Sequence, residues 1–171
     1  TVSLIKILMK EKEKFEKTPD DLDLAVIRKI SEMDIPHSVP TSQIPPMHMT
    51  HERARMDYSG ITHLHHFFLP RAAHALGLMW ELAKSHPDDR TRRSLVYVVE
   101  QAIWTMSVLN RFQPQGFKQV NKYLPGVYYV PSHTCEVSPW YAIGARGTRV
   151  AKTFSNFRTA SGGIFVTTGS A

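Results

Sequence analysis

The longest stretch with a helical apolar pattern in this chain, residues 88–110, limits the possible folds more than any other feature. Apolar residues cover most of the circumference of the predicted helix; they are Leu95, Val96, Val98, Val99, Ala102, Ile103, Met106 and Leu109. A helix that is apolar on most sides must be surrounded by other elements. We therefore expect it at the centre of a helical domain, which a chain of 171 residues is long enough to form.

Four other segments carry the signals of helices, so the sequence predicts about five in all. Residues 3–17 combine apolar residues with a run of alternating lysine and glutamate, which is typical of an exposed helix face. A second helix is expected to begin after Pro19, with a stripe of apolar residues at helical spacing. These residues are Leu22, Val26, Ile30 and Met33. Pro70 begins a third helix that extends to about residue 84, and Ser138-Pro139 begins a fourth that extends to about residue 157.

Short strands are predicted in the second half of the chain. Residues 127–130 are valine and tyrosine, which favour strands, and residues 134–137 form another short extended piece. Residues 164–168 predict a buried strand, which needs neighbours on both sides to satisfy its backbone groups. We therefore expect the chain to be an internal part of a larger protein. The expected fold class is α+β, predominantly α-helical, with about five helices and a few short strands.

Residues 35–50 hold four prolines and little periodicity, which indicates an extended connector. We expect residues 1–50 to comprise the N-terminal helices and this connector, and residues 51–171 to complete a single compact unit. No apolar run is long enough to span a bilayer, so no membrane partner is expected. The single cysteine, Cys135, excludes an internal disulfide, which suits a reducing cytoplasm.

Positive charge is the main functional signal in the composition. The net charge is +6, which makes a polyanionic partner plausible. Arg90 and Arg93 lie in the first turns of the longest predicted helix, at the positive end of its dipole, where they need acidic or phosphate partners. Residues 111–123 interleave cations with aromatic residues, a pattern that suits contact with phosphates and bases, although the aromatic residues could instead anchor this segment to the core. Its cations are Arg111, Lys118 and Lys122.

The nine histidines raise the possibility of a metal site. His63, His65 and His66 lie close together, but their spacing matches none of the established zinc motifs and no carboxylate lies within the cluster. We therefore expect no metal. Residues 144–149 lack the Gly-Lys-Ser/Thr ending of a phosphate-binding loop. Cys135 has no local arrangement with His133 that would indicate a nucleophile, so no catalytic residue is assigned.

Two stretches together resemble bacterial site-specific DNA methyltransferases of the adenine-specific type. The first is GIT at residues 60–62 followed by FFLPR at residues 67–71, which resembles the family pattern "GYT…DFFTPRQLLAL". The second is NRF at residues 110–112, GVYYVPS at residues 126–132 and Glu136, which resembles "tGTLYIPSLSYEWNVF". The chain departs from the pattern at His66, where the family has an acidic residue.

The resemblance implies a fragment of an S-adenosylmethionine-dependent enzyme that methylates the amino group of adenine, or N4 of cytosine. The chain lacks the family's Gly-rich "FxGxG" turn, which holds the methyl donor, and its Asp-Pro-Pro-Tyr/Phe motif, which positions the base. By this resemblance both belong to the remainder of the parent chain, and residues 164–168 are the last strand before the catalytic motif in a Rossmann-like sheet. Residues 51–171 would then be a helical insert that contacts double-stranded DNA without binding S-adenosylmethionine itself.

The expected DNA contacts are therefore Arg90, Arg93, Arg111, Lys118 and Lys122. Two alternatives remain open. A helical module could present the same basic face to an acidic protein partner. A metal-dependent hydrolase could use the histidine cluster. The target base, the recognition sequence and the oligomeric state cannot be read from the sequence.

Overall fold

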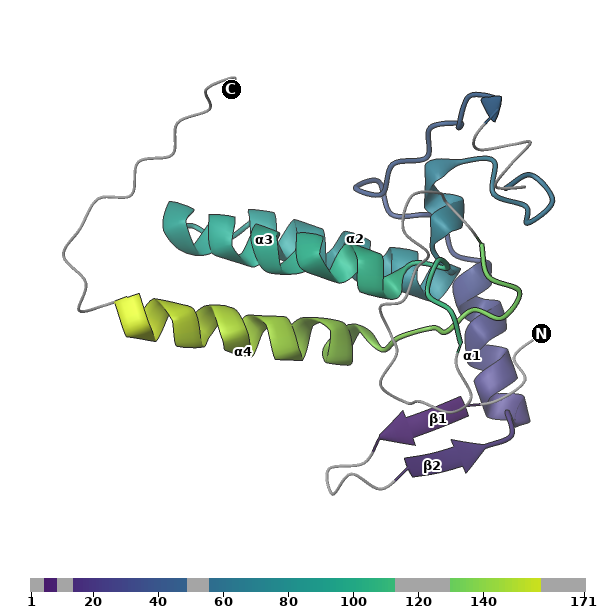
Figure 1. Ribbon diagram of the computed structural model, residues 1–171, viewed down its shortest axis with the longest axis horizontal. Helices are drawn as coiled ribbons and strands as arrows, with labels where there is room; N and C mark the ends of the chain where they lie inside the picture. Colours follow the sequence, from purple (N-terminus) through teal and green to yellow (C-terminus); the bar gives the residue numbers. More distant parts are fainter. Residues whose placement is uncertain (1–4, 9–13, 49–55, 113–129, 158–171) are drawn as a thin grey trace.

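The computed structural model describes residues 5–8, 14–48, 56–112 and 130–157. Within these residues the chain forms four α-helices, a short 3-10 helix and one antiparallel pair of strands (Figure 1). The predicted predominance of helix is therefore confirmed. The sheet in the described residues is two-stranded, and the predicted strand at 164–168 lies outside them, as do residues 127–129.

Three helices form the main body, and α3 lies in its middle. α2 (Pro70–Lys84) and α4 (Pro139–Phe157) both pack against α3 (Asp89–Met106) and touch each other less extensively (Figure 1). The core between them contains Ala72, Leu76, Ala83, Val99, Ala102, Met106, Val137 and Ala142. The central position predicted for the longest helix is confirmed. Its burial is less complete than predicted, because Tyr97 and Trp104 are half exposed.

Local sequence signals set where these helices begin. The Asp88 carboxylate accepts a hydrogen bond from the Thr91 N–H at 2.7 Å, which caps the first turn of α3. Pro70 occupies the first turn of α2, where its missing N–H costs nothing. α3 ends at Met106, short of the predicted residue 110. The chain there becomes extended and makes isolated bridges from Ser107 to Phe68 and from Arg111 to Thr134.

The predicted helix over residues 3–17 is wrong. β1 (Ile5–Leu8) and β2 (Lys14–Lys17) pair antiparallel, with Ile5 opposite Lys17 and Leu8 opposite Lys14. The β-branched residues Ile5 and Ile7 occupy alternate positions, which favours a strand over a helix. The lysine–glutamate run that suggested an exposed helix face lies largely between the two strands in sequence.

α1 (Asp21–Ser31) begins where the sequence predicted it. The side chain of Asp20 accepts the Asp23 N–H at 2.9 Å, and the Asp23 side chain accepts the Asp20 N–H at 3.0 Å, forming a capping box. The predicted apolar stripe on this helix is not buried. Leu22 is 74% exposed and Met33 is 52% exposed, although α1 does contact α2.

The predicted connector packs against α2 through a glycine. Residues 35–48 contain none of the named helices or strands, as expected for a proline-rich segment. A Cβ added at Gly77 would lie 2.8 Å from the Cβ of Pro36, so the connector could not approach α2 this closely over a larger residue. Further along, Ile44 joins Met56 and Ile61 in a second, smaller core.

Candidate nucleic-acid interface

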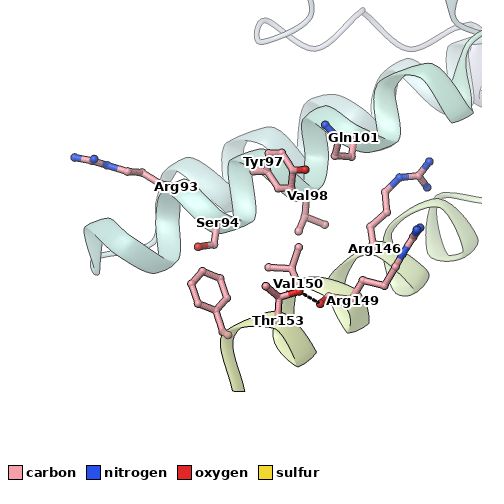
Figure 2. Close-up of a pocket in the computed structure, with 10 residues that line it drawn as sticks. Arg93, Ser94, Tyr97, Val98, Gln101, Arg146, Arg149, Val150 and Thr153 are labelled. Atoms are coloured by element: carbon pink, nitrogen blue, oxygen red, sulfur yellow. Dashed lines mark hydrogen bonds between the residues drawn. The ribbon is translucent and has the colours of Figure 1, made fainter. Parts of the chain in front are cut away.

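A groove of about 690 Å³ runs between α3 and α4 (Figure 2). From α3 it is lined by Arg93, Ser94, Tyr97, Val98 and Gln101, and from α4 by Arg146, Arg149, Val150, Thr153 and Phe154. Residues on each helix recur three or four positions apart, so they share one face of that helix. The two helices run antiparallel, so Gln101 lies toward the Arg146 end of the groove (Figure 1 and Figure 2), and the contact between Arg90 and Phe154 marks the opposite end.

Cations dominate the charge of this groove. It is lined by three arginines, and none of the lining residues is acidic. Arg93 has a partner on its own helix, because its guanidinium lies 2.6 Å from the Asp89 carboxylate, yet its side chain remains 80% exposed. An exposed ion pair of this kind is weak, so Arg93 can exchange Asp89 for another anion at little cost.

Arg146 and Arg149 are held by neutral oxygen atoms. Arg146 donates to the Ala142 carbonyl at 2.5 Å and to the Thr105 hydroxyl, which links α4 to α3. Arg149 donates to the Ala145 carbonyl at 3.2 Å. Burial lowers the pKa of Arg146, and the positive charge of Arg149 lowers it further. Two neighbouring cations thus repel each other, and an anion bound between them would relieve the repulsion.

Aromatic side chains lie among these cations. Tyr97 is 52% exposed on α3 and Phe154 is 39% exposed on α4. The guanidinium of Arg90 lies 5.4 Å from the centre of the Phe154 ring, within the range of a cation–π contact. The groove therefore offers both positive charge and accessible rings.

The structure brings together only part of the predicted site. Arg93 lines the groove and Arg90 contacts one of its walls through Phe154. The acidic partner expected for Arg93 is Asp89, which also pairs with Arg92, whereas Arg90 contacts the Phe154 ring. Arg111 is exposed beyond the end of α3 and is not among the residues that line the groove. Lys118 and Lys122 lie outside the described residues.

Sequence reasoning missed Arg146 and Arg149. The signal was present, because residues 139–157 contain three cations, the third being Lys152, and no acidic residue. Because glycines flank Arg146, residues 144–149 were compared with a phosphate-binding loop and not with a basic helix face. In the structure Gly144 and Gly147 belong to α4, and a Cβ at either would meet nothing within 4 Å.

The histidine cluster forms a separate feature. The rings of His63, His65 and His66 lie 4.3–5.6 Å apart, centre to centre. The Nδ1 atoms of His63 and His66 lie 2.9 and 3.3 Å from the Thr62 hydroxyl. Among the described residues, no group of three or more histidine, cysteine or acidic side chains is placed to hold a metal ion. The pKa of His65 is lowered, mainly by burial and further by the charges of His66 and His63.

Acid is expected to destabilise the protein through His65. At pH values above its usual pKa of 6.5, His65 is neutral in both the folded and the unfolded chain. Below pH 6.5, His65 takes up a proton in the unfolded chain but stays neutral in the folded chain, because its pKa is lowered there. The free energy of unfolding therefore falls as the pH drops towards the lowered pKa of the folded chain. Melting temperatures measured from about pH 7.5 to 5.5 would show this fall. His65→Gln should flatten the profile, and an equally steep fall in this variant would contradict the assignment to His65.

Comparison of this chain with protein families, with curated proteins and with solved structures gives no match in any of the three. None of the described helices is both long and apolar enough to cross a bilayer. Function is therefore inferred from the groove and from the sequence pattern.

Proposed function

We propose that this chain is the DNA-contacting part of an S-adenosylmethionine-dependent, site-specific DNA methyltransferase, and that the α3–α4 groove binds the DNA backbone. The enzyme would methylate the amino group of adenine or N4 of cytosine in double-stranded DNA. The observation that supports DNA contact is the set of three arginines, Arg93 at one end and Arg146 and Arg149 toward the other, that line a groove with no acidic lining residue.

Arginine suits this role because its planar guanidinium presents several N–H donors to phosphate oxygens. Each phosphate that the protein neutralises also releases a condensed counterion, which favours binding at low salt. Arg146 is held against Thr105 and Ala142, so it loses little side-chain freedom when an anion binds. Arg93 and Arg149 are exposed and would supply the accessible charge at the rims of the groove.

The methyltransferase assignment is supported by the two resembling stretches. Arg71 from the first stretch and Glu136 from the second form a two-point ion pair, with N···O distances of 2.8 and 2.5 Å. Within the second stretch, the Cys135 N–H, next to Glu136, donates to the Asn110 carbonyl at 2.9 Å. If the two stretches belong to one structural unit, they are expected to contact each other. The ion pair between Arg71 and Glu136 is such a contact.

The described residues do not form a cradle for S-adenosylmethionine. Gly144 and Gly147 lie within a helix and not at a strand-to-helix turn, and the sheet among these residues is a two-stranded hairpin. The donor pocket and the loop that clamps an extruded base therefore belong, in this proposal, to the remainder of the parent chain. No step of methyl transfer is assigned to these residues.

The experiment compares two double variants that each remove two positive charges. Arg93→Ala/Arg149→Ala removes accessible groove cations, whereas Arg28→Ala/Lys29→Ala removes exposed cations on α1. Fluorescence anisotropy with a labelled duplex at low salt should show that the groove variant binds roughly tenfold more weakly or worse, because charged hydrogen bonds are lost. The α1 variant should bind nearly as well as the original chain. Equal weakening by both variants would mean that only net charge matters and would contradict the groove assignment.

A protein-interaction module remains the second candidate, and the exposed apolar stripe on α1 favours it. Leu22 is 74% exposed and Val26 is 46% exposed, as expected of a surface that binds another protein. The same anisotropy assay separates the two functions. An acidic protein that displaces the duplex at low concentration, with tighter binding of its own, would favour the interaction module.

A further inference from the structure

We propose that the α3–α4 groove binds an unpaired DNA strand in preference to a paired duplex, with phosphates on the groove arginines and a base stacked on Tyr97. The proposal rests on the proposed function, because the same arginines provide the contacts to phosphate. Beyond that function, the proposal specifies that unpaired DNA reaches the floor of the groove and that Tyr97 holds a base.

The width of the groove is the first argument. Two helices in direct contact have axes about 8–10 Å apart, so the groove between their outer faces is narrow. The major groove of DNA alone is about 12 Å wide, and the whole duplex is wider still. A duplex could therefore touch only the rims of the α3–α4 groove. Val98 on the floor is 6% exposed, so it lies well below those rims. A single strand is thin enough to reach the floor with its bases and keep its phosphates at the rims.

The combination of residue types is the second argument. Proteins that bind single strands combine a positively charged groove with aromatic side chains on which bases stack. Tyr97 lies between Arg93 and Gln101 along α3, opposite Val150 on α4, and Arg149 and Arg146 lie further toward the Gln101 end (Figure 2). Its ring is half exposed and is therefore accessible to a base. Phe154 is less suitable, because Arg90 already lies against its ring.

The proposal also fits the chemistry of the proposed parent enzyme. An enzyme that modifies an amino group on a base must first unpair and unstack that nucleotide. A groove that prefers unpaired DNA would stabilise the strand next to the extruded base. The energy of that contact would offset part of the cost of opening the duplex.

The test uses anisotropy with a labelled thymidine oligonucleotide and with a duplex of the same length, at the same low salt. The original chain should bind the single strand several-fold more tightly than the duplex. Tyr97→Ala should weaken single-strand binding about fivefold or more, as expected when stacking with one base is lost, and should change duplex binding little. Tyr97→Phe should retain binding, because it keeps the ring. Tyr141→Ala is the matched control, since Tyr141 is 51% exposed but does not line the groove.

The possible outcomes separate this proposal from the function on which it rests. If Arg93→Ala/Arg149→Ala weakens both forms of DNA while Tyr97→Ala behaves like Tyr141→Ala, the stacking proposal is wrong and DNA contact stands. Tighter binding of the duplex than of the single strand would overturn the proposal in the same way. If the arginine variant weakens neither form, the proposed function itself fails.

Discussion

Replacing Ala102 by leucine should lower the free energy of unfolding by about 1–3 kcal/mol, the usual cost of overfilling a packed core. Ala102 is 0% exposed on α3, and its core cluster contains residues of both α2 and α4. A larger side chain there must push neighbouring helices apart or adopt a strained rotamer. Because the groove is formed by α3 and α4, the same change should also weaken DNA binding.

Chemical denaturation followed by circular dichroism measures this effect. Ala151→Leu is the matched control, because Ala151 is exposed on α4 and leucine there fills no occupied space. We expect the midpoint to fall for Ala102→Leu and to stay nearly constant for Ala151→Leu. Similar midpoints for the two variants would show that α2, α3 and α4 do not pack around Ala102 as described.

Met56→Ala should cost about 2–5 kcal/mol, the range for truncating a long buried side chain. Met56 is 1% exposed and packs with Ile44 and Ile61 in the second core. Its loss leaves a cavity between the connector and the segment that leads to the histidine cluster. This is the larger of the two expected losses, since the alanine replaces a whole side chain.

A methionine at the surface provides the comparison. Met33 is 52% exposed, so Met33→Ala should change the free energy of unfolding by less than about 0.5 kcal/mol, as is usual at exposed sites. Both variants can be compared by urea denaturation under the same conditions. If Met56→Ala proves as mild as Met33→Ala, the small core formed with Ile44 and Ile61 does not contribute to folding.

The helix starts were predictable because they depend on a few local residues. Asp88 and Pro70 act within one turn of the helix that they begin, so their effect can be read without knowing the fold. The segment at residues 3–17 was not predictable in the same way. Its lysine–glutamate run fits a helix face, and strand pairing between Ile5–Leu8 and Lys14–Lys17 decided its structure.

Burial and site geometry depend on contacts between distant residues, which the sequence does not state. The stripe of α1 has helical spacing, yet Leu22 remains exposed because α1 meets α2 without covering that residue. Arg146 and Arg149 form a groove with Arg93 only because α4 lies along α3. The absence of acidic residues from residues 139–157 indicates a basic helix. It does not indicate that α3 is the helix that lies beside it.

Counterion release gives the most direct test of the claim that the α3–α4 arginines bind DNA phosphates. The dissociation constant for a duplex should be measured over a series of salt concentrations, for the original chain and for Arg93→Ala/Arg149→Ala. Each lost phosphate contact should make the slope of log affinity against log salt shallower by about 0.9, so the variant should be shallower by about 1.8. Identical slopes for the two proteins, or an affinity that does not change with salt, would contradict the account.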